Sequence, residues 1–263
     1  MSSSLDRLLR IMARLRDPSG GCPWDLEQSF ASIAPHTIEE AYEVVEAIES
    51  GDRPALRDEL GDLLFQVVFY AQMASEEGCF DFEAIAAGIC EKMERRHPHV
   101  FGQARIADAA AQTVNWEAQK AAERAAKAGD RAPSALDGVS TTLPALTRAL
   151  KLQARAGRVG FDWPEAAQVL DKIAEEIEEV RAEMIEGVEL DRLEDEIGDL
   201  LFACVNLARK LKIDPEGALR RGNRKFERRF GHIERALAQQ GRSPSEASLE
   251  EMEALWVEAK QQE

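Results

Sequence analysis

The sequence is poor in aromatic residues and has no excess of positive charge. Only 6% of its 263 residues are aromatic, while Ala, Leu, Glu and Arg are abundant, and this balance favours helices over sheets. Its 49 acidic residues outnumber 33 basic ones, giving a net charge of −16. Because a nucleic-acid interface normally needs a basic face, this charge argues against a DNA or RNA polymer as partner.

Cysteine pairs, long apolar runs and phosphate-binding loops are also missing. The four cysteines stand far apart without a CxxC pair, which indicates reduced thiols in a cytoplasmic protein. The charged first 17 residues lack a signal-peptide core, and the apolar stretch 63–73 is too short to span a bilayer. GxxxxGK[ST] and GxGxxG do not occur, which excludes a P-loop or Rossmann fingerprint. We therefore expect a cytoplasmic protein with no membrane partner.

What the sequence does contain is an internal repeat. Residues 57–72 (RDELGDLLFQVVFYAQ) align with residues 194–209 (EDEIGDLLFACVNLAR), and 9 of the 16 positions are identical. An EExxE motif precedes each block, a K-x-E-R-R motif follows it, and the order of these motifs is the same in both copies. The chain is thus predicted to be one unit duplicated in tandem.

The composition changes between the two copies. Residues 121–142 are rich in Ala and small polar residues and contain Gly129, Pro133 and Gly138, which is typical of a linker. We predict an N-terminal unit over residues 1–130, a linker over 131–142 and a C-terminal unit over 143–263, each unit being near the usual size of a domain.

Each unit is predicted to be all-α. Apolar residues from Ala41 to Ile48 form one stripe at helical spacing, and the stretch 56–73 is apolar nearly all round, as in a helix packed between others. Thr37 is the predicted N-cap of the first of these helices. A break near Gly51 and a restart after Pro54 predict a helical hairpin.

Acidic residues border the apolar stripes of both hairpins. The first unit has Glu40, Glu43, Glu59 and Asp62, and the second has Glu176, Glu179, Glu196 and Asp199. If each hairpin packs face to face, its four carboxylates converge at one edge, where Gly61 would let a neighbouring backbone approach. Two like charges roughly 4 Å apart repel by about 4 kcal/mol at an effective dielectric constant near 20. Four carboxylates at one edge are therefore expected to surround a cation. The alternative is that they do not converge and form an acidic helix face in contact with solvent.

The ligand types narrow the choice of cation. Oxygen ligands without His or Cys suit Mg²⁺, or Mn²⁺ as a substitute. A di-iron bundle would need Glu-x-x-His pairs, but both units have Asp at the position of that His. His97 and His99 have no third ligand near them in the sequence, which disfavours a zinc site.

These motifs together resemble the MazG nucleoside triphosphate pyrophosphohydrolases. The resemblance rests on EExxE followed by ExxD in both units, on Gly21-Cys-Pro-Trp-Asp25, on ELGDLLF and EIGDLLF, and on RRHPHVF at 95–101, and it covers essentially the whole chain. It implies an all-α pyrophosphohydrolase fold of tandem MazG-like units, which pair into dimers. It also implies the Mg²⁺-dependent hydrolysis of an NTP to NMP and pyrophosphate, with broad use of NTPs and dNTPs. We accordingly expect a homodimer that acts on nucleoside triphosphates.

The resemblance also suggests roles for individual residues. The catalytic and metal-binding set would be Glu176, Glu179, Glu196 and Asp199, with Glu175 as a general base and the first unit's four carboxylates as a weaker second metal set. Predicted substrate-binding residues are Lys172, Arg192, Asn223, Lys225, Arg229 and Trp256. Lys225 and Arg229 would contact phosphates, although an ion-pair network around Glu227 is the alternative, and Trp256 would either stack on a base or pack.

The two copies differ at three of these positions. His36, Ala55 and Cys90 stand where the second unit has Lys172, Arg192 and Asn223. Each difference removes a cation or an amide, so the second unit is predicted to carry the main activity and the first to be weaker, regulatory or structural. Narrower pyrophosphohydrolases acting on dUTP, dCTP or phosphoribosyl-ATP, and a non-enzymatic helical scaffold, remain as alternatives.

Overall fold

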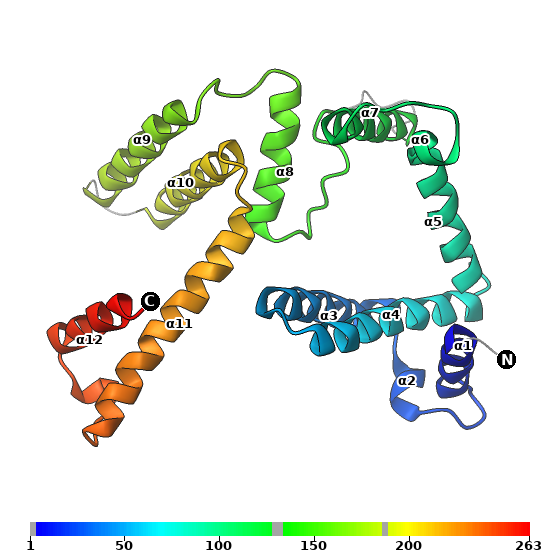
Figure 1. Ribbon diagram of the computed structural model, residues 1–263, viewed down its shortest axis with the longest axis horizontal. Coiled ribbons are helices and arrows are strands. Elements are labelled where there is room, and N and C mark those ends of the chain that lie inside the picture. The colour runs from blue at the N-terminus through cyan, green and yellow to red at the C-terminus, as the bar shows by residue number, and fades with distance from the viewer. Residues whose placement is uncertain (1–3, 128–133, 186–188) are drawn as a thin grey trace. The chain divides into compact units, whose positions relative to one another are not determined.

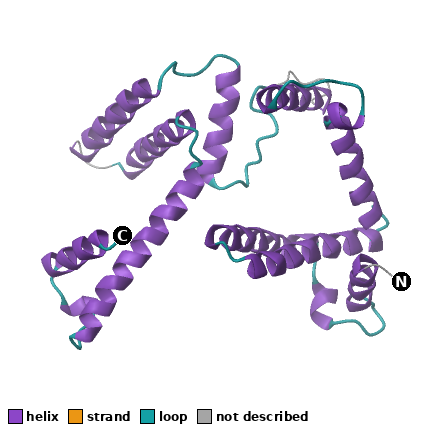
Figure 2. Cartoon of the chain, in the orientation of Figure 1, coloured by secondary structure: helices purple, strands orange, loops and turns teal. Residues whose placement is uncertain are grey.

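The computed structural model describes residues 4–127, 134–185 and 189–263, and within them the regular elements are all helices (Figure 2). The all-α prediction is thus confirmed. The elements are α1 (Ser4–Leu15), α2 (Pro23–Glu27), α3 (Phe30–Ser50), α4 (Arg53–Glu76), α5 (Phe82–Arg96), α6 (Pro98–Phe101), α7 (Ala109–Lys127), α8 (Ala145–Arg158), α9 (Ala166–Ile185), α10 (Leu190–Lys210), α11 (Pro215–Gln239), the 3₁₀ turn η1 (Pro244–Glu246) and α12 (Leu249–Gln261). Among the described helices, none is long and apolar enough to cross a membrane.

The chain divides into two compact units, residues 1–120 and 121–263, so the division falls within α7. The boundary predicted near residue 130 and the start of the predicted 131–142 linker lie outside the described residues. The linker therefore stays a prediction, and each unit is considered by itself.

The helical hairpin of the first unit starts earlier than its sequence indicates. Ser29, not Thr37, is the N-cap of α3, and it forms a capping box with Ser32. Thr37 lies inside the helix, where its hydroxyl is 2.9 Å from the Tyr70 hydroxyl. The N-cap prediction was wrong because the capping box starts the helix upstream and carries it through Pro35.

A two-residue connection closes this hairpin. Gly51 caps the C-terminal end of α3, and its φ of 75° lies in the left-handed region that glycine adopts without strain. Asp52 then caps α4 by accepting a hydrogen bond from the Ala55 amide. The two long helices consequently pack side by side (Figure 1).

The first unit has an apolar core. The helix α1 packs against α4, and the buried side chains form one apolar cluster of Met12, Ile33, Val68, Phe69 and Met73. Partly buried residues of α1, α4 and α5 surround this cluster. Burial of this cluster fixes how the α3–α4 hairpin is held.

The second unit repeats the hairpin but surrounds it differently. Helices α9 and α10 pack together, α8 packs against α10, and α11 contacts both α8 and α10 (Figure 1). The helix α12 packs on α11. Among the described residues of this unit, three polar side chains are buried, namely Gln153, Glu176 and Asn206. These three residues belong to α8, α9 and α10, respectively.

Candidate active site

Three carboxylates from two neighbouring helices meet in the second unit. Glu176 is on α9, while Glu196 and Asp199 are on α10, one turn apart. One carboxylate oxygen of each lies within 4.8 Å of the others. Glu176 is only 4% exposed, and its Oε2 is buried without a hydrogen-bond partner. A buried, unpartnered carboxylate oxygen is costly, so this arrangement calls for a cation.

Lys172 supplies positive charge to the α9 side of this cluster. Its Nζ lies 2.8 Å from Glu175 Oε1, 2.9 Å from Glu176 Oε1 and 3.9 Å from Glu179 Oε2. Hydrogen bonds to Glu175 and Glu176 raise the pKa of Lys172 above its usual value. The ammonium therefore stays charged at neutral pH and offsets part of the repulsion among the glutamates.

Two predicted members of the site lie at its margin. Glu179 falls outside the three-carboxylate group, and burial, opposed by the Lys172 charge, raises the pKa of its carboxyl. Glu175, the predicted base, has a largely exposed side chain whose Oε1 accepts a hydrogen bond from Lys172. Both glutamates thus lie beside Lys172, which also contacts Glu176.

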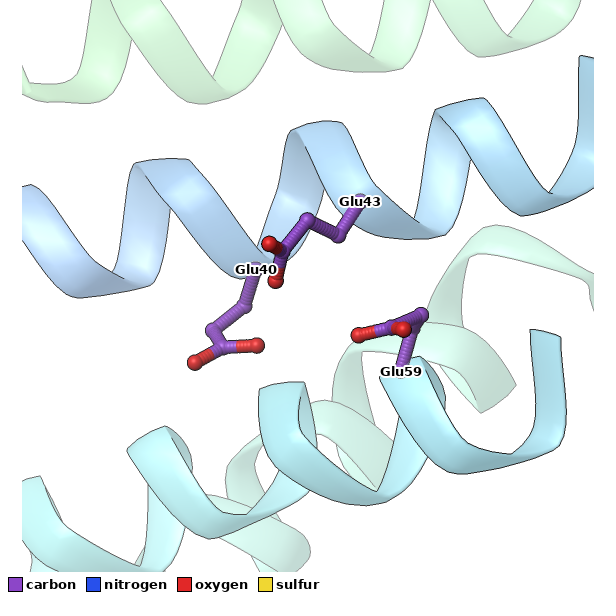
Figure 3. Close-up of side chains that lie close together, drawn as sticks. All are labelled: Glu40, Glu43 and Glu59. Carbon is purple, nitrogen blue, oxygen red and sulfur yellow. The ribbon is translucent and has the colours of Figure 1, made fainter. Parts of the chain in front are cut away.

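The first unit gathers a similar group without a lysine. Glu40 and Glu43 of α3 face Glu59 of α4 (Figure 3), with one oxygen of each within 4.8 Å of the others. Burial is the largest cause that raises the pKa of Glu40, and the negative charges of Asp62 and Glu43 raise it further. Burial likewise raises the pKa of Glu59 most, and the charges of Glu43 and Asp62 add to this. Asp62 therefore acts electrostatically on the group while lying outside it.

Both groups suit a hard divalent cation. Their donors are carboxylate oxygens only, which is the ligand type that Mg²⁺ and Mn²⁺ prefer. In the second unit, Oε2 of Glu176 has no hydrogen-bond partner, so this oxygen is available as a metal ligand. Glu176, Glu196 and Asp199 are thus the residues that could hold the ion there, and Glu40, Glu43 and Glu59 could hold one in the first unit. The two groups are not equivalent residue for residue, because Glu43 aligns with Glu179 and Asp62 with Asp199.

One expectation about the hairpin was wrong. Gly61 was predicted to allow close approach of a neighbouring backbone, but a Cβ built there meets nothing within 4 Å among the described residues, and the same holds for Gly198. Each glycine instead leaves open space beside the acidic group.

The predicted substrate-binding residues are spread over three places in the second unit. Arg192 lies 3.7 Å from Glu183 rather than among the carboxylates. On α11, Asn223 and Lys225 are exposed. Arg229 binds Glu263 at 2.7 Å, and its guanidinium stacks 5.3 Å from the Trp256 ring centroid. Only Lys172 lies in direct contact with the acidic group in the described part of the chain.

Gln153 and Asn206 were not predicted as site residues. Both amides are more than nine-tenths buried, at 6% and 4% exposure. A single amide residue in a helical sequence is ordinarily interpreted as facing solvent. The signal that these two amides are buried comes from the other repeat, which has an apolar residue at each of the equivalent positions.

Both copies of the repeat match a known family, and known proteins are similar to nearly the whole chain. A family model described as the MazG nucleotide pyrophosphohydrolase domain matches residues 28–101 and 165–233. A nucleoside triphosphate pyrophosphohydrolase of Escherichia coli K12 is 54% identical over 262 residues, which cover 99% of this chain and 98% of the relative.

Two further relatives match nearly the whole of this chain, and one of them is about twice its length. The nucleoside triphosphate pyrophosphohydrolase/pyrophosphatase MazG of Thermotoga maritima is 40% identical, with 97% of this chain and 95% of the relative covered. The Bacillus subtilis protein YabN, described as uncharacterized, is 44% identical over 96% of this chain but only 51% of its own length. With two matches to the family model and near-complete coverage, the chain belongs to the MazG family of nucleotide pyrophosphohydrolases, which are hydrolases acting on phosphoric anhydrides.

Proposed function

We propose that this chain is a Mg²⁺-dependent nucleoside triphosphate pyrophosphohydrolase of broad NTP and dNTP scope. Water attacks the α-phosphorus, the bond from that phosphorus to the bridging oxygen breaks, and NMP and pyrophosphate are released. The observation that carries the proposal is the buried, unpartnered Glu176 oxygen within a group of three carboxylates. When bound there, Mg²⁺, or Mn²⁺ in its place, would neutralise triphosphate charge and polarise water.

Glu175 and Lys172 act together in this proposal. Glu175 takes the proton from the attacking water, but its carboxylate is held by Lys172 at 2.8 Å, and an ion-paired carboxylate is a poor base. We assign Lys172 to the phosphates of the incoming substrate. When its ammonium group pairs with the triphosphate instead of with Glu175, the Glu175 carboxylate becomes available as a base while the substrate is bound.

The remaining cations bind the substrate from α10 and α11. Lys225 is exposed and Arg229 is adjacent on the helical surface, so both are assigned to phosphate oxygens, with Asn223 and Arg192 at the edge of the site. Trp256 contacts Phe226, at 5.5 Å between ring centroids, as well as Arg229. These contacts support a role for Trp256 in holding the Arg229 side chain.

We further propose a homodimer. Large apolar side chains on the hairpins of both units are exposed, including Ile38 and Leu60 in the first unit and Leu170 and Leu201 in the second. Rows of exposed leucine and isoleucine on packed helices are typical of a surface covered by a second copy. Sedimentation equilibrium tests this proposal, and a monomer at micromolar concentration would contradict it.

The reaction is tested with a panel of NTPs and dNTPs and Mg²⁺ in water enriched in ¹⁸O. The expected products are monophosphate and pyrophosphate, with the label in the monophosphate because attack is at the α-phosphorus. Label in pyrophosphate, or release of orthophosphate and NDP, would contradict the proposal. Turnover of dUTP or dCTP alone would identify a narrower enzyme. A melting temperature that ignores both Mg²⁺ and nucleotide would point to a scaffold.

A further inference from the structure

One buried amide beside the acidic group of the first unit has no role in the site described above. Gln66 of α4 is only 7% exposed. Its Nε2 lies 3.4 Å from Glu40 Oε1, which is long for a hydrogen bond, and its Oε1 is buried without a partner. A buried carbonyl oxygen that lacks a partner costs free energy, so this amide calls for a ligand, as the Glu176 oxygen does in the second unit.

This amide distinguishes the first unit from the second. The alignment of residues 57–72 with residues 194–209 pairs Gln66 with Ala203. Ala203 is buried as well, but its methyl group offers neither a donor nor an acceptor. Both copies of the duplicated hairpin therefore carry the acidic motif, and the first has an additional oxygen beside its carboxylates.

The two acidic groups also differ in the positive charge that they already hold. In the second unit, the Lys172 ammonium lies 2.9 Å from Glu176 Oε1 and competes with a metal ion for that oxygen. At the equivalent position of the first unit, His36 lies 3.5 Å from Glu39, while the Oε1 of Glu40 contacts the neutral Gln66 amide. As long as Lys172 stays on Glu176, the first unit is the more favourable site for a free cation.

The 3.4 Å between Gln66 Nε2 and Glu40 Oε1 indicates the size of that cation. Two oxygens bound at right angles are about 3.4 Å apart on Ca²⁺, whose bonds are about 2.4 Å long, and only about 2.9 Å apart on Mg²⁺. Rotation of the terminal amide by 180° exchanges its nitrogen and oxygen, which brings the carbonyl oxygen to the place beside Glu40. One amide atom lacks a partner in either orientation, so the rotation gives up only the long contact and gains a metal bond.

We propose that the first unit holds a divalent cation larger than Mg²⁺, of the size of Ca²⁺, and that it does so without nucleotide. Glu40, Glu43 and Glu59, whose nearest oxygens lie within 4.8 Å of one another, supply the carboxylates (Figure 3). The Gln66 carbonyl oxygen is the neutral ligand. Amide carbonyls are ordinary ligands of Ca²⁺, whereas Mg²⁺ takes fewer protein oxygens and keeps more water.

The occupancy of this site follows the concentration of the free cation rather than that of the substrate. The sequence alone made the first unit the weaker of the two metal sets and counted Asp62 among its ligands, and the proposal departs from that expectation in both respects. It does not depend on the proposed reaction, because no nucleotide takes part in it.

Isothermal titration calorimetry of the whole, metal-free chain without nucleotide tests the proposal. CaCl₂ is expected to bind more tightly than MgCl₂. Gln66→Met should weaken Ca²⁺ binding about tenfold or more and should change Mg²⁺ binding by less than about twofold. Gln72→Met is the matched control on the same helix, because its amide donates to Glu76. Glu40→Gln should remove the Ca²⁺ site, whereas Glu176→Gln should leave it unchanged.

An equal loss of Ca²⁺ and Mg²⁺ affinity in Gln66→Met would overturn the amide as a ligand. Loss of the Ca²⁺ site in Glu176→Gln, with the site retained in Glu40→Gln, would overturn its place in the first unit. A second measurement uses the wild-type protein with ¹³C in the glutamine side-chain carbonyls. CaCl₂ should shift the NMR signal of Gln66 more than MgCl₂ does, and a signal that CaCl₂ leaves in place overturns the proposal even where a variant fails to fold. Normal Ca²⁺ binding without pyrophosphate release would contradict the proposed reaction and support this site.

Discussion

The two units carry the same acidic residues in different surroundings. Around Glu176, Lys172 contributes an ammonium at 2.9 Å, whereas the first unit has His36 at this position, 3.5 Å from Glu39. Beside α10 two amides line a cavity, whereas Met12 and Phe69 pack into a core beside α4. Comparison of the copies therefore shows the same acidic residues in two different surroundings, and we expect these neighbours to decide which cation and which parts of a substrate each unit can hold.

The largest expected difference between the units is in turnover. Glu176→Gln should reduce kcat by about 100-fold or more, because a lost ligand removes several kcal/mol of charge stabilisation in the transition state. Glu40→Gln, at the equivalent position, should leave most of the activity. Pyrophosphate release at saturating Mg²⁺ and NTP measures both. Loss of turnover in Glu40→Gln with activity retained in Glu176→Gln would reverse the assignment of the main site.

A smaller effect is expected on α11. Arg229→Ala should raise KM about tenfold, since a charge-assisted contact to phosphate is lost. Arg228→Ala is the matched control, because Arg228 binds the same Glu263 at 2.5 Å but is not assigned to phosphate. Steady-state kinetics with one NTP distinguishes the two variants. Equal changes in both would show that the pairing with Glu263, rather than phosphate binding, is what matters.

The role of the lysine can be tested by removing it from the second unit and by placing a lysine at the equivalent position of the first. Lys172→Met should lower the melting temperature of the metal-free protein by about 2–4 °C, because the glutamates lose their ammonium. The raised pKa of Lys172 means that its stabilisation is fully present below the ordinary lysine pKa, and hence at pH 7. Mg²⁺ should then stabilise the variant more than the wild type. His36→Lys should raise the melting temperature of the metal-free protein in calorimetry and reduce its stabilisation by Mg²⁺. An unchanged melting temperature in both variants would contradict the proposed role of the lysine.

The smallest effect concerns pH. Since the pKa values of Glu40 and Glu59 are raised on folding, ionisation of these groups destabilises the metal-free first unit above those pKa values, and this cost is relieved as the pH falls through them. Glu40→Gln should therefore raise the melting temperature at pH 7 by about 1–2 °C, and the gain should shrink towards pH 5. Melts across this pH range check it, and a gain that grows towards pH 5 would contradict the argument.

The fold and much of the acidic group follow from local patterns. Helical spacing places Glu196 and Asp199 on one face, and duplication of the motif supports the same reading in both units. Glu179 and Asp62 fit the same spacing yet fall outside the groups, because side-chain torsions and neighbouring charges decide the last few ångströms.

Other features depend on tertiary structure. Pro35 favours a helix start after it, but the Ser29 capping box overrides that local preference. Gln153 and Asn206 have ordinary helical positions in the sequence, and their burial arises only where α8 packs on α10. Sequence periodicity cannot distinguish such an amide from one that faces solvent.

The short turn at Gly51 and Asp52 also has a kinetic consequence. It brings Glu40, Glu43 and Glu59 together through a single antiparallel helix pair, so contacts between them need little loop closure and form early during folding. The negative charges of these glutamates therefore repel one another in the hairpin before the rest of the unit has packed. A divalent cation is therefore expected to accelerate refolding of the hairpin, beyond slowing its unfolding, so that the chain's assembly rate becomes sensitive to the magnesium concentration around it.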